Sequence, residues 1–340
     1  MSVPARTVVL ASRNPDKLRE LREICAGLPL RVVAGSEVSG LPEVIEDGTT
    51  ALGNATRKAV ATAAYTGEIA VADDTTFQVR CLGGLPDIFA SRFAGPQASY
   101  ADNAALVLDL LRDVADEARD ARFEASLVWV DPRPAPGLTA AGAAPEVHAR
   151  WLHNPFAGPR VLPPGADAAR YWNGRCDRRS TWADYQARAA AVARGWGVDA
   201  DRVAGILQRL VQPYLAGGRP ENAPPEAIRL PDTRLWTADG PDDLDSPEDL
   251  AMPAVLPPEA PGRALNAPTW LELAANGRLP GRIGREPLGN GGFGYDPIFV
   301  PVGQDRTLAE LAAAEKHAIS HRARALRRLF AAVGRIYGDG

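Results

Sequence analysis

The sequence predicts an α/β protein, in which short apolar strands alternate with segments of helical periodicity. The first observation is the β-branched run Thr7–Ala11, followed by a polar loop and by apolar residues at helical spacing over Leu18–Leu28. The second is the short apolar run Ile69–Ala72, which follows an alanine-rich segment of helical pattern and is bounded by polar residues. We therefore expect a buried sheet with helices around it.

Length and composition indicate a globular chain. Its 340 residues suffice for one large domain or two ordinary ones, and 46% hydrophobic and 24% charged residues are typical of soluble proteins. A net charge of -4 gives no overall attraction to nucleic acid or to an anionic membrane, so we expect neither as a partner. Any phosphate binding must come from a local site.

The sequence shows neither a targeting signal nor cysteines at metal-ligand spacing, and we therefore expect a cytoplasmic protein. No apolar run approaches the roughly 20 residues that a membrane helix needs, and Met1–Thr7 lacks the apolar core of a signal peptide. Cys25, Cys81 and Cys176 are widely separated and show no metal-ligand spacing, so we interpret them as reduced thiols.

The loop Ser12–Lys17 joins the first strand to the first helix, an arrangement that aims free backbone N–H groups at an anion. It lacks the glycines and the Lys-Ser/Thr pair of a Walker loop. Taken alone, Lys17 could equally be a solvated helix lysine. Val32–Val33 is expected to begin another short strand.

An alanine-rich helix is predicted from Thr50 or Leu52 to Tyr65. Asn54 and Lys58 are four residues apart and so share one face of it, which is either a functional face or a solvated polar stripe. Glu46 lies in the loop just before this helix.

The acidic pair Asp73-Asp74 follows Ile69–Ala72, at the carboxyl end of the predicted strand, where open α/β sheets place their ligands. Adjacent carboxylates are unfavourable unless they share a cation or a proton. The alternative is that the pair turns the chain or caps the next element. A further strand is predicted over Phe77–Cys81.

Downstream, we predict a helix over Ala101–Ala115 and a strand over Phe123–Val130. From Pro132 the chain becomes rich in proline, alanine and glycine, and only two helices are predicted there, Thr181–Arg194 and Asp201–Tyr214. Pro213 should end or kink the second. Four tryptophans are expected to form a small core around this helix pair: Trp151, Trp172, Trp182 and Trp196. The irregular spacing of His148, His153 and Cys176 argues against a metal site.

Regular structure is predicted to return near Thr269. A glycine-rich aromatic stretch runs from Gly289 to Pro301, and helices are predicted over Thr307–Glu315 and Ala318–Tyr337. The last helix carries Ser320, His321 and Arg322, which alone would be interpreted as an ordinary basic helix start.

Four separated blocks together resemble the inosine triphosphate pyrophosphatase family. The matching stretches are Ala11–Glu20; Glu46 with Asn54–Ala59; Ala72–Phe77 with Leu82–Pro86 and Ser91–Gly95; and Gly292–Phe299 with Ala309–Leu311, Glu315-Lys316 and Ile319–Arg322. The resemblance covers residues 5–131 and about 268–335. It therefore predicts one family domain in two parts, 1–131 and 268–340, separated by an insertion over 132–267.

The resemblance implies a twisted central mixed sheet with two lobes around a cleft, and hydrolysis of ITP, dITP and XTP to monophosphate and pyrophosphate. It implies that Glu46 and Asp74 hold Mg²⁺, with Asp74 also the general base and Asp73 in support. Lys17 and Lys58 are expected to neutralise phosphate oxygens. Further phosphate-side contacts are expected from Ser12, Arg13, Asn14, Asn54 and Thr75.

Base selection is expected in the C-terminal block. Phe293 would offer a stacking face, and His321 and Arg322 would donate to the carbonyl at purine position 6, where adenine instead presents an amino group. Lys316 is expected on the base or ribose side. The matching motif also places Gly294, Tyr295 and Asp296 among the substrate-binding residues.

Three departures from the family pattern fall in the third block. Thr75-Thr76 stands where bacterial members commonly carry Ser-Gly, Pro86-Asp87 replaces Pro-Gly, and Ala90-Ser91-Arg92 replaces Ser-Ala-Arg. The alternatives to the predicted activity are a specialised enzyme for an unusual nucleotide and a non-catalytic nucleotide-binding or scaffold protein. Retention of the charged set argues against the latter. Family members are commonly homodimers, which is the assembly we expect.

Overall fold

The computed structural model describes residues 6–12, 15–25, 29–46, 50–134, 147–153, 182–215 and 269–337. Within them, a mixed eight-stranded sheet has the strand order β2-β1-β3-β5-β7-β6, with β4 added to β3 and β8 to β7. The strands are β1 (Arg6–Leu10), β2 (Leu30–Ala34), β3 (Ile69–Val79), β4 (Pro86–Asp87), β5 (Asp120–Asp131), β6 (Val147–His153), β7 (Thr269–Ile283) and β8 (Phe299–Pro301).

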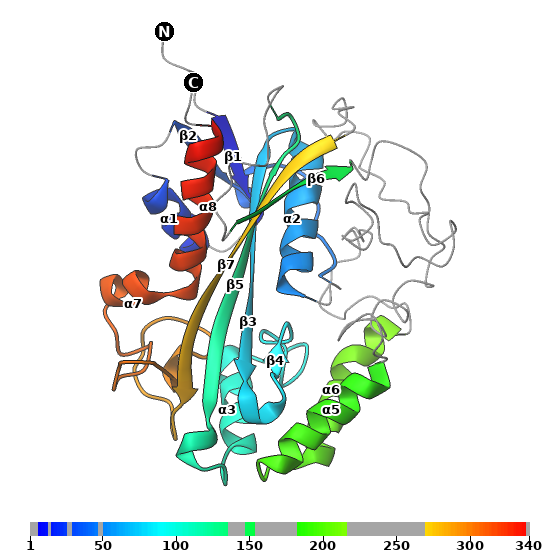
Figure 1. Ribbon diagram of the computed structural model, residues 1–340, viewed down its shortest axis with the longest axis vertical. Coiled ribbons are helices and arrows are strands. Elements are labelled where there is room, and N and C mark those ends of the chain that lie inside the picture. The colour runs from blue at the N-terminus through cyan, green and yellow to red at the C-terminus, as the bar shows by residue number, and fades with distance from the viewer. Residues whose placement is uncertain are drawn as a thin grey trace.

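Helices flank the sheet along its whole length, which confirms the α/β class. In Figure 1, α1, α2 and α8 lie beside the upper half of the long strands, whereas α3, α5 and α6 lie beside the lower half. The helices are α1 (Pro15–Ile24), α2 (Ala51–Thr66), α3 (Tyr100–Leu110), α5 (Trp182–Gly195), α6 (Ala200–Leu215), α7 (Ala313–Ile319) and α8 (His321–Tyr337). Among the described helices, none is long and apolar enough to cross a membrane.

The acidic pair lies inside β3 rather than at a strand end, so the prediction of two strands, Ile69–Ala72 and Phe77–Cys81, is wrong. The strand continues because β5 pairs with it antiparallel through the polar segment, with Asp73 opposite Leu127 and Asp74 opposite Ser126. The parallel neighbour β1 pairs only with the first three residues of β3 and ends at Leu10. The pair therefore lies just beyond the carboxyl end of β1.

Successive side chains of a strand point to opposite faces of the sheet, and this alternation sorts the two acids. Ile69 and Val71 pack into a core formed with α1 and α8, whereas Ala70 and Ala72 pack against α2. Asp73 continues the first series and Asp74 the second. The two carboxylates therefore face different helices.

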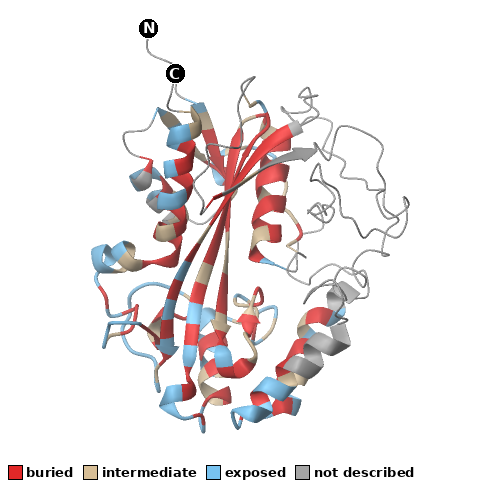
Figure 2. Ribbon diagram, in the orientation of Figure 1, coloured by how far each residue is buried: buried red, intermediate tan, exposed pale blue. Residues whose placement is uncertain are grey.

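Helix α2 is held by caps at both ends, which keeps its alanine-rich face against the sheet. The Thr50 hydroxyl accepts a hydrogen bond from the backbone N–H of Gly53 at 3.0 Å. At the other end Gly67 has a φ of 71° and donates its N–H to Ala63 O at 2.8 Å. Figure 2 shows buried residues over most of α2 and along the upper halves of β3, β5 and β7.

The C-terminal helices are shorter than predicted, and the break between them falls at Ser320. The helix expected over Thr307–Glu315 is instead α7, and α8 begins at His321. Ser320 has extended backbone angles, and its hydroxyl accepts a hydrogen bond from the N–H of Ala323 at 3.1 Å. This cap places His321 and Arg322 in the first turn of α8.

The two helices predicted in the insertion are confirmed as α5 and α6. They pack against residues that follow β3 and share a hydrophobic core with them. Ala189, Ala193 and Leu207 belong to the same buried cluster as Leu82 and Phe89. The packing is close because a Cβ added at residue 83, a glycine, would lie 3.0 Å from the Cα of Ala189. Pro213 does not stop α6 at once; the helix ends two residues later.

Trp196 contradicts the predicted tryptophan core. Its side chain is 39% exposed and lies beside the Arg80 guanidinium, 5.5 Å from the ring centroid. The side chains of the other predicted core tryptophans, and those of His148, His153 and Cys176, lie outside the described residues. Cys25 and Cys81 are buried free thiols, as predicted.

Candidate active site

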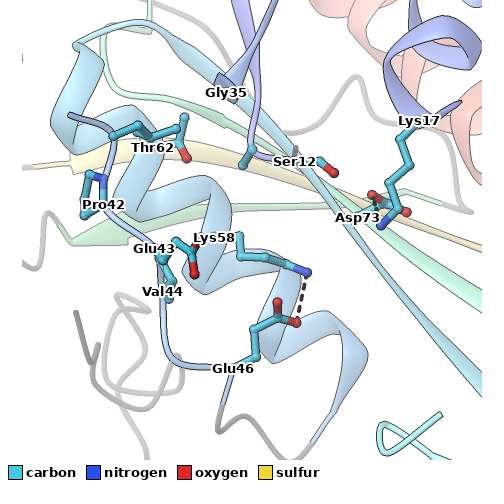
Figure 3. A pocket seen from close by; sticks show the side chains of 12 residues that line it. Ser12, Lys17, Gly35, Pro42, Glu43, Val44, Glu46, Lys58, Thr62 and Asp73 are labelled. Carbon is cyan, nitrogen blue, oxygen red and sulfur yellow. Dashed lines mark hydrogen bonds and ion pairs between the residues drawn. The ribbon is translucent and has the colours of Figure 1, made fainter. Parts of the chain in front are cut away.

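A cavity of about 290 Å³ opens beside β1 and β3, where three of the four sequence blocks meet. Figure 3 shows Lys58 and Glu46 joined at one side of it and Lys17 next to Asp73 at the other. The lining residues are Ala11, Ser12, Lys17, Gly35, Leu41, Pro42, Glu43, Val44, Glu46, Lys58, Thr62 and Asp73. Five ionisable side chains, Lys17, Glu43, Glu46, Lys58 and Asp73, thus share one polar cavity with the predicted Ser12.

On the α2 face, one lysine holds two carboxylates. The Nζ of Lys58 lies 3.1 Å from Oε2 of Glu46 and 3.5 Å from Oδ1 of Asp74. One turn earlier, the Asn54 amide donates to Oδ2 of Asp74 at 3.3 Å. The predicted shared face of Asn54 and Lys58 therefore faces Asp74 and is not a solvated stripe.

Burial and like charge shift the protonation of this face. Burial of Asp74, together with the nearby negative charges of Glu46 and Asp73, raises the pKa of Asp74 to about 6 although Lys58 opposes the shift. Burial disfavours the charge on Lys58, but Asp74 and Glu46 outweigh it and hold the Lys58 pKa above its ordinary value. Asp74 is thus poised to accept a proton near neutral pH beside a permanent cation.

On the opposite face, one carboxylate holds two cations. Asp73 is only 4% exposed; its Oδ1 lies 2.8 Å from Nζ of Lys17, and its Oδ2 accepts a hydrogen bond from Nε of Arg322 at 3.0 Å. Burial opposes ionisation, but Lys17 and Arg322 prevail and hold the pKa of Asp73 below its ordinary range. Asp73 therefore joins the N-terminal loop to the C-terminal helix through a charged cluster.

The glycine-rich block presents Phe293 next to two cations. The ring is 37% exposed, with Nζ of Lys316 5.3 Å and Cζ of Arg322 5.9 Å from its centroid. Asp296 fixes this arrangement because its Oδ2 accepts the Phe293 N–H at 2.8 Å and lies 2.6 Å from Nζ of Lys316. The predicted Asp296 thus orders the loop and the lysine.

His321 lies flat against Phe123, with ring centroids 4.9 Å apart and 8° between the planes. Burial lowers its pKa well below the ordinary value, so the imidazole is neutral. Among the described residues, neither ring nitrogen has a hydrogen-bond partner, and the buried hydroxyl of Thr75 also lacks one. Both side chains retain hydrogen-bonding capacity for a ligand.

Tyr295 differs from the prediction. Its side chain is buried, its hydroxyl donates to Ala90 O at 2.8 Å, and its ring stacks on Phe77 at 4.2 Å. The Tyr295 side chain therefore belongs to the core, and a direct substrate contact from it is not supported. The neighbouring Gly294 has a φ of 70°, a conformation that a glycine adopts without strain.

The sequence analysis did not single out Asn103, which the structure shows to hold a loop of the site. The fully buried Asn103 donates to Ser91 O at 3.1 Å and accepts from the Ala94 N–H at 2.7 Å, so it fixes the loop that carries the Ser91–Gly95 motif. Its position on the buried face of α3 was the available signal, because a buried amide there needs partners. Arg13 and Asn14 lie outside the described residues.

Comparison with known proteins divides the chain into two matching parts, as the sequence resemblance did. The model of the Ham1 family matches residues 8–146 and 264–332, leaving 147–263 between the two parts. The chain is 31% identical to a dITP/XTP pyrophosphatase of Anaeromyxobacter sp. (strain Fw109-5) over 335 residues, 98% of this chain and 99% of that protein. It is 28% identical to a dITP/XTP pyrophosphatase of Mycobacterium tuberculosis (strain ATCC 25618 / H37Rv) over 329 residues, 96% and 94% of the two chains.

Solved structures share the fold. A HAM1 protein from Coxiella burnetii is similar with a TM-score of 0.52 and 24% identity, over 96% of this chain and 98% of that one. The Staphylococcus aureus Ham1 protein gives a TM-score of 0.51 and 19% identity over the same shares. The mixed sheet with flanking helices is therefore the architecture of these structures.

Proposed function

This chain belongs to the Ham1 family, and we propose from that premise that it hydrolyses deaminated purine nucleoside triphosphates to the monophosphate and pyrophosphate. The expected substrates are dITP and XTP, for which its relatives are named, together with ITP. The observation that carries the proposal is the acidic pair, since Asp73 and Asp74 face opposite sides of β3 and each meets cations from another block.

In the reaction, a water oxygen bonds to the α-phosphorus as the bond from that phosphorus to the bridging oxygen of the leaving pyrophosphate breaks. Asp74 accepts the proton of the attacking water. The contacts of Asp74 with Lys58 and Asn54 hold its carboxylate in place, and a neighbouring cation favours the ionised form, which is the form that can take the proton.

The negative triphosphate requires compensating charge and donors. Lys58 and Lys17 line the cavity and supply positive charge, each now neutralised by carboxylates that a ligand would share. The Thr75 hydroxyl has capacity for a phosphate oxygen, and Ser12 lines the same cavity. Contacts from Arg13, Asn14 and Asn54 remain predictions.

Glu46 and Asp74 are the residues that would hold Mg²⁺. An oxygen of each lies within 3.5 Å of the Nζ of Lys58, and hard oxygen donors are those that Mg²⁺ prefers. The described residues contain no group of three or more His, Cys, Asp or Glu side chains suited to a metal. When bound, Mg²⁺ supplies charge that stabilises the triphosphate oxygens.

For the base we propose stacking on Phe293 and hydrogen bonding to the 6-carbonyl from Arg322 and neutral His321. A neutral imidazole has one N–H donor, which suits a carbonyl acceptor. Adenine would present a donor to these donors and leave them unpaired, which disfavours it. Lys316 stays on the base or ribose side, close to the same ring.

A panel of nucleoside triphosphates with pyrophosphate detection tests this function. With Mg²⁺ present, we expect pyrophosphate from dITP, XTP and ITP and much less from ATP, whose base presents an amino group at position 6. Orthophosphate release, or pyrophosphate release without base preference, would contradict the proposal. Homodimerisation and a cytoplasmic location remain predictions, the first of which light scattering on the purified chain would check.

A further inference from the structure

Two exposed aromatic rings touch at the edge of the candidate site. Tyr100, the first residue of α3, and Phe293 have ring centroids 6.0 Å apart at an angle of 50°, yet they stay 49% and 37% exposed. Large exposed apolar side chains that gather from distant segments mark a binding surface. Among the described residues, six large apolar side chains are exposed, Tyr100, Val192, Trp196, Leu288, Phe293 and Val302, and Tyr100 and Phe293 are in ring contact.

Both rings are held in place from their backbones. A capping box fixes the first turn of α3, because the Ser99 hydroxyl accepts the Asp102 N–H at 3.2 Å and the Asp102 carboxylate accepts the Ser99 N–H at 2.8 Å. Tyr100 lies in that turn. On the other side, the Phe293 N–H donates to Asp296 at 2.8 Å. The pair is therefore organised before a ligand arrives.

The tyrosine ring also covers the glycine that follows Phe293. A Cβ added to Gly294 would lie 4.0 Å from Cδ1 of Tyr100, so the ring rests along this backbone. Lys316 and Arg322 lie near the same Phe293 ring, at 5.3 and 5.9 Å from its centroid. The aromatic pair and the two cations thus form one surface suited to a flat heterocycle that carries a carbonyl acceptor.

We infer that Tyr100 and Phe293 together form the aromatic wall of the base site, with Tyr100 as a positioning residue that sets the tilt of the Phe293 ring. The ligand is the purine base of the nucleotide, so the inference rests on the proposed function. The sequence blocks that resemble the family do not include Tyr100. It enters the site only because α3 begins beside the glycine-rich loop.

The test measures ligand binding without turnover, by calorimetry on the full chain carrying Asp74→Asn, in the presence of Mg²⁺. The ligands are ITP and inorganic tripolyphosphate, which lacks a base. Tyr100→Ala should weaken ITP binding roughly tenfold and leave tripolyphosphate binding unchanged, because the Phe293 ring loses the neighbour that fixes its tilt for stacking and a ligand without a base does not use that ring. Tyr100→Phe should retain ITP binding, since it keeps the ring. Trp196→Ala is the matched control: this exposed aromatic lies in the turn between α5 and α6, beside Arg80, and its loss should change the binding of neither ligand.

Tyr100→Leu provides a second test if the alanine variant proves unstable, because it keeps apolar volume and removes the ring. Unchanged ITP binding in either variant, or an equal loss for ITP and tripolyphosphate, would overturn the inference. The proposed function fails differently: the unsubstituted chain would then release no pyrophosphate, and the Asp74→Asn parent would bind no ITP. The two failures are therefore distinguishable.

Discussion

Asp73 and Asp74 are neighbours in sequence, yet they face opposite sides of β3 and differ in environment. Asp74 is 18% exposed on the α2 face, shares Lys58 with Glu46, and has a pKa raised to about 6. Asp73 is 4% exposed on the α1 and α8 face, holds Lys17 and Arg322 on its two oxygens, and has a lowered pKa. The comparison shows how one strand, through its alternation, presents a carboxylate of raised pKa on one face and a carboxylate that binds two cations on the other.

The largest expected effect is on Asp74. Asp74→Asn removes the proton acceptor and a predicted metal ligand but keeps the shape of the side chain, so turnover of ITP should fall by about 10² to 10⁴-fold. The assay is steady-state pyrophosphate release with saturating Mg²⁺ and ITP, with circular dichroism as a check of folding. Full activity in the folded variant would refute the assignment of the general base.

Asp73→Asn should instead act first on stability. The change leaves two cations near each other without their carboxylate, which we expect to lower the free energy of unfolding by about 3 kcal/mol at pH 7. The pKa of Asp73 is depressed in the folded protein, so its contribution is present above the unfolded-state pKa of about 3.9 and is lost as pH falls toward the folded value.

Urea unfolding at several pH values measures this contribution. The difference between the parent and Asp73→Asn should be constant near neutral pH and shrink below about pH 4. The exposed Asp113→Asn is the control and should stay within about 0.5 kcal/mol of the parent. A difference that does not depend on pH would mean that the charge of Asp73 is not what stabilises the fold.

Variants of Arg322 test whether this residue, which is bound to Asp73, also contributes to selectivity for the base. Arg322→Ala should reduce kcat/KM for ITP more than for ATP, because it removes a donor matched to the 6-carbonyl. The difference should correspond to roughly 1–3 kcal/mol of transition-state stabilisation. Arg322→Lys keeps a charge for Asp73 but loses the planar fork, so it should restore stability better than selectivity. Equal losses for both nucleotides would assign Arg322 to phosphate binding or to structure alone.

The smallest effect on chemistry is expected from the insertion. Asp131 of β5 pairs with Leu271 of β7, so a short turn can replace residues 132–267 between neighbouring antiparallel strands. We expect kcat/KM for ITP within about 1 kcal/mol of the full chain. Stability should fall, because the cut removes β6 and uncovers the surface on which α5 and α6 pack.

The deletion product is assayed by Michaelis–Menten kinetics, with thermal unfolding followed in parallel. A folded product that has lost ITP turnover would show that the insertion belongs to the active site.

Local sequence predicted the elements well where one pattern dominated, and failed where pairing or packing decided. Two strands were predicted where β3 is one, because polar residues at 73–76 interrupt the apolar pattern and only the antiparallel partner β5 carries the strand through. The segment after Thr307 carries a capping pattern, and the Glu310 carboxylate does accept the Thr307 N–H. It remains a turn, with Leu308 and Leu311 buried in the core.

In the site, too, contacts set by local sequence spacing could be predicted, whereas contacts set by packing could not. The helical spacing of Asn54 and Lys58 correctly predicted a common face, since that depends on neighbours in sequence. The contact between Asp73 and Arg322 joins residues 249 positions apart, which no local pattern specifies. Tyr295 was placed with the substrate by its motif, whereas packing against Phe77 buries its ring.

The most direct test compares Asp73→Asn and Asp74→Asn side by side, measuring ITP and ATP turnover by pyrophosphate release and the binding of a non-hydrolysable ITP analogue by calorimetry. We expect Asp74→Asn to bind the analogue within a few-fold of the parent, a difference of about 1 kcal/mol or less, but not to turn ITP over. Asp73→Asn should keep measurable turnover and lose preference for ITP over ATP. If both variants lose binding, turnover and preference to the same extent, the two carboxylates act as one unit and the proposed division between the faces of β3 is wrong.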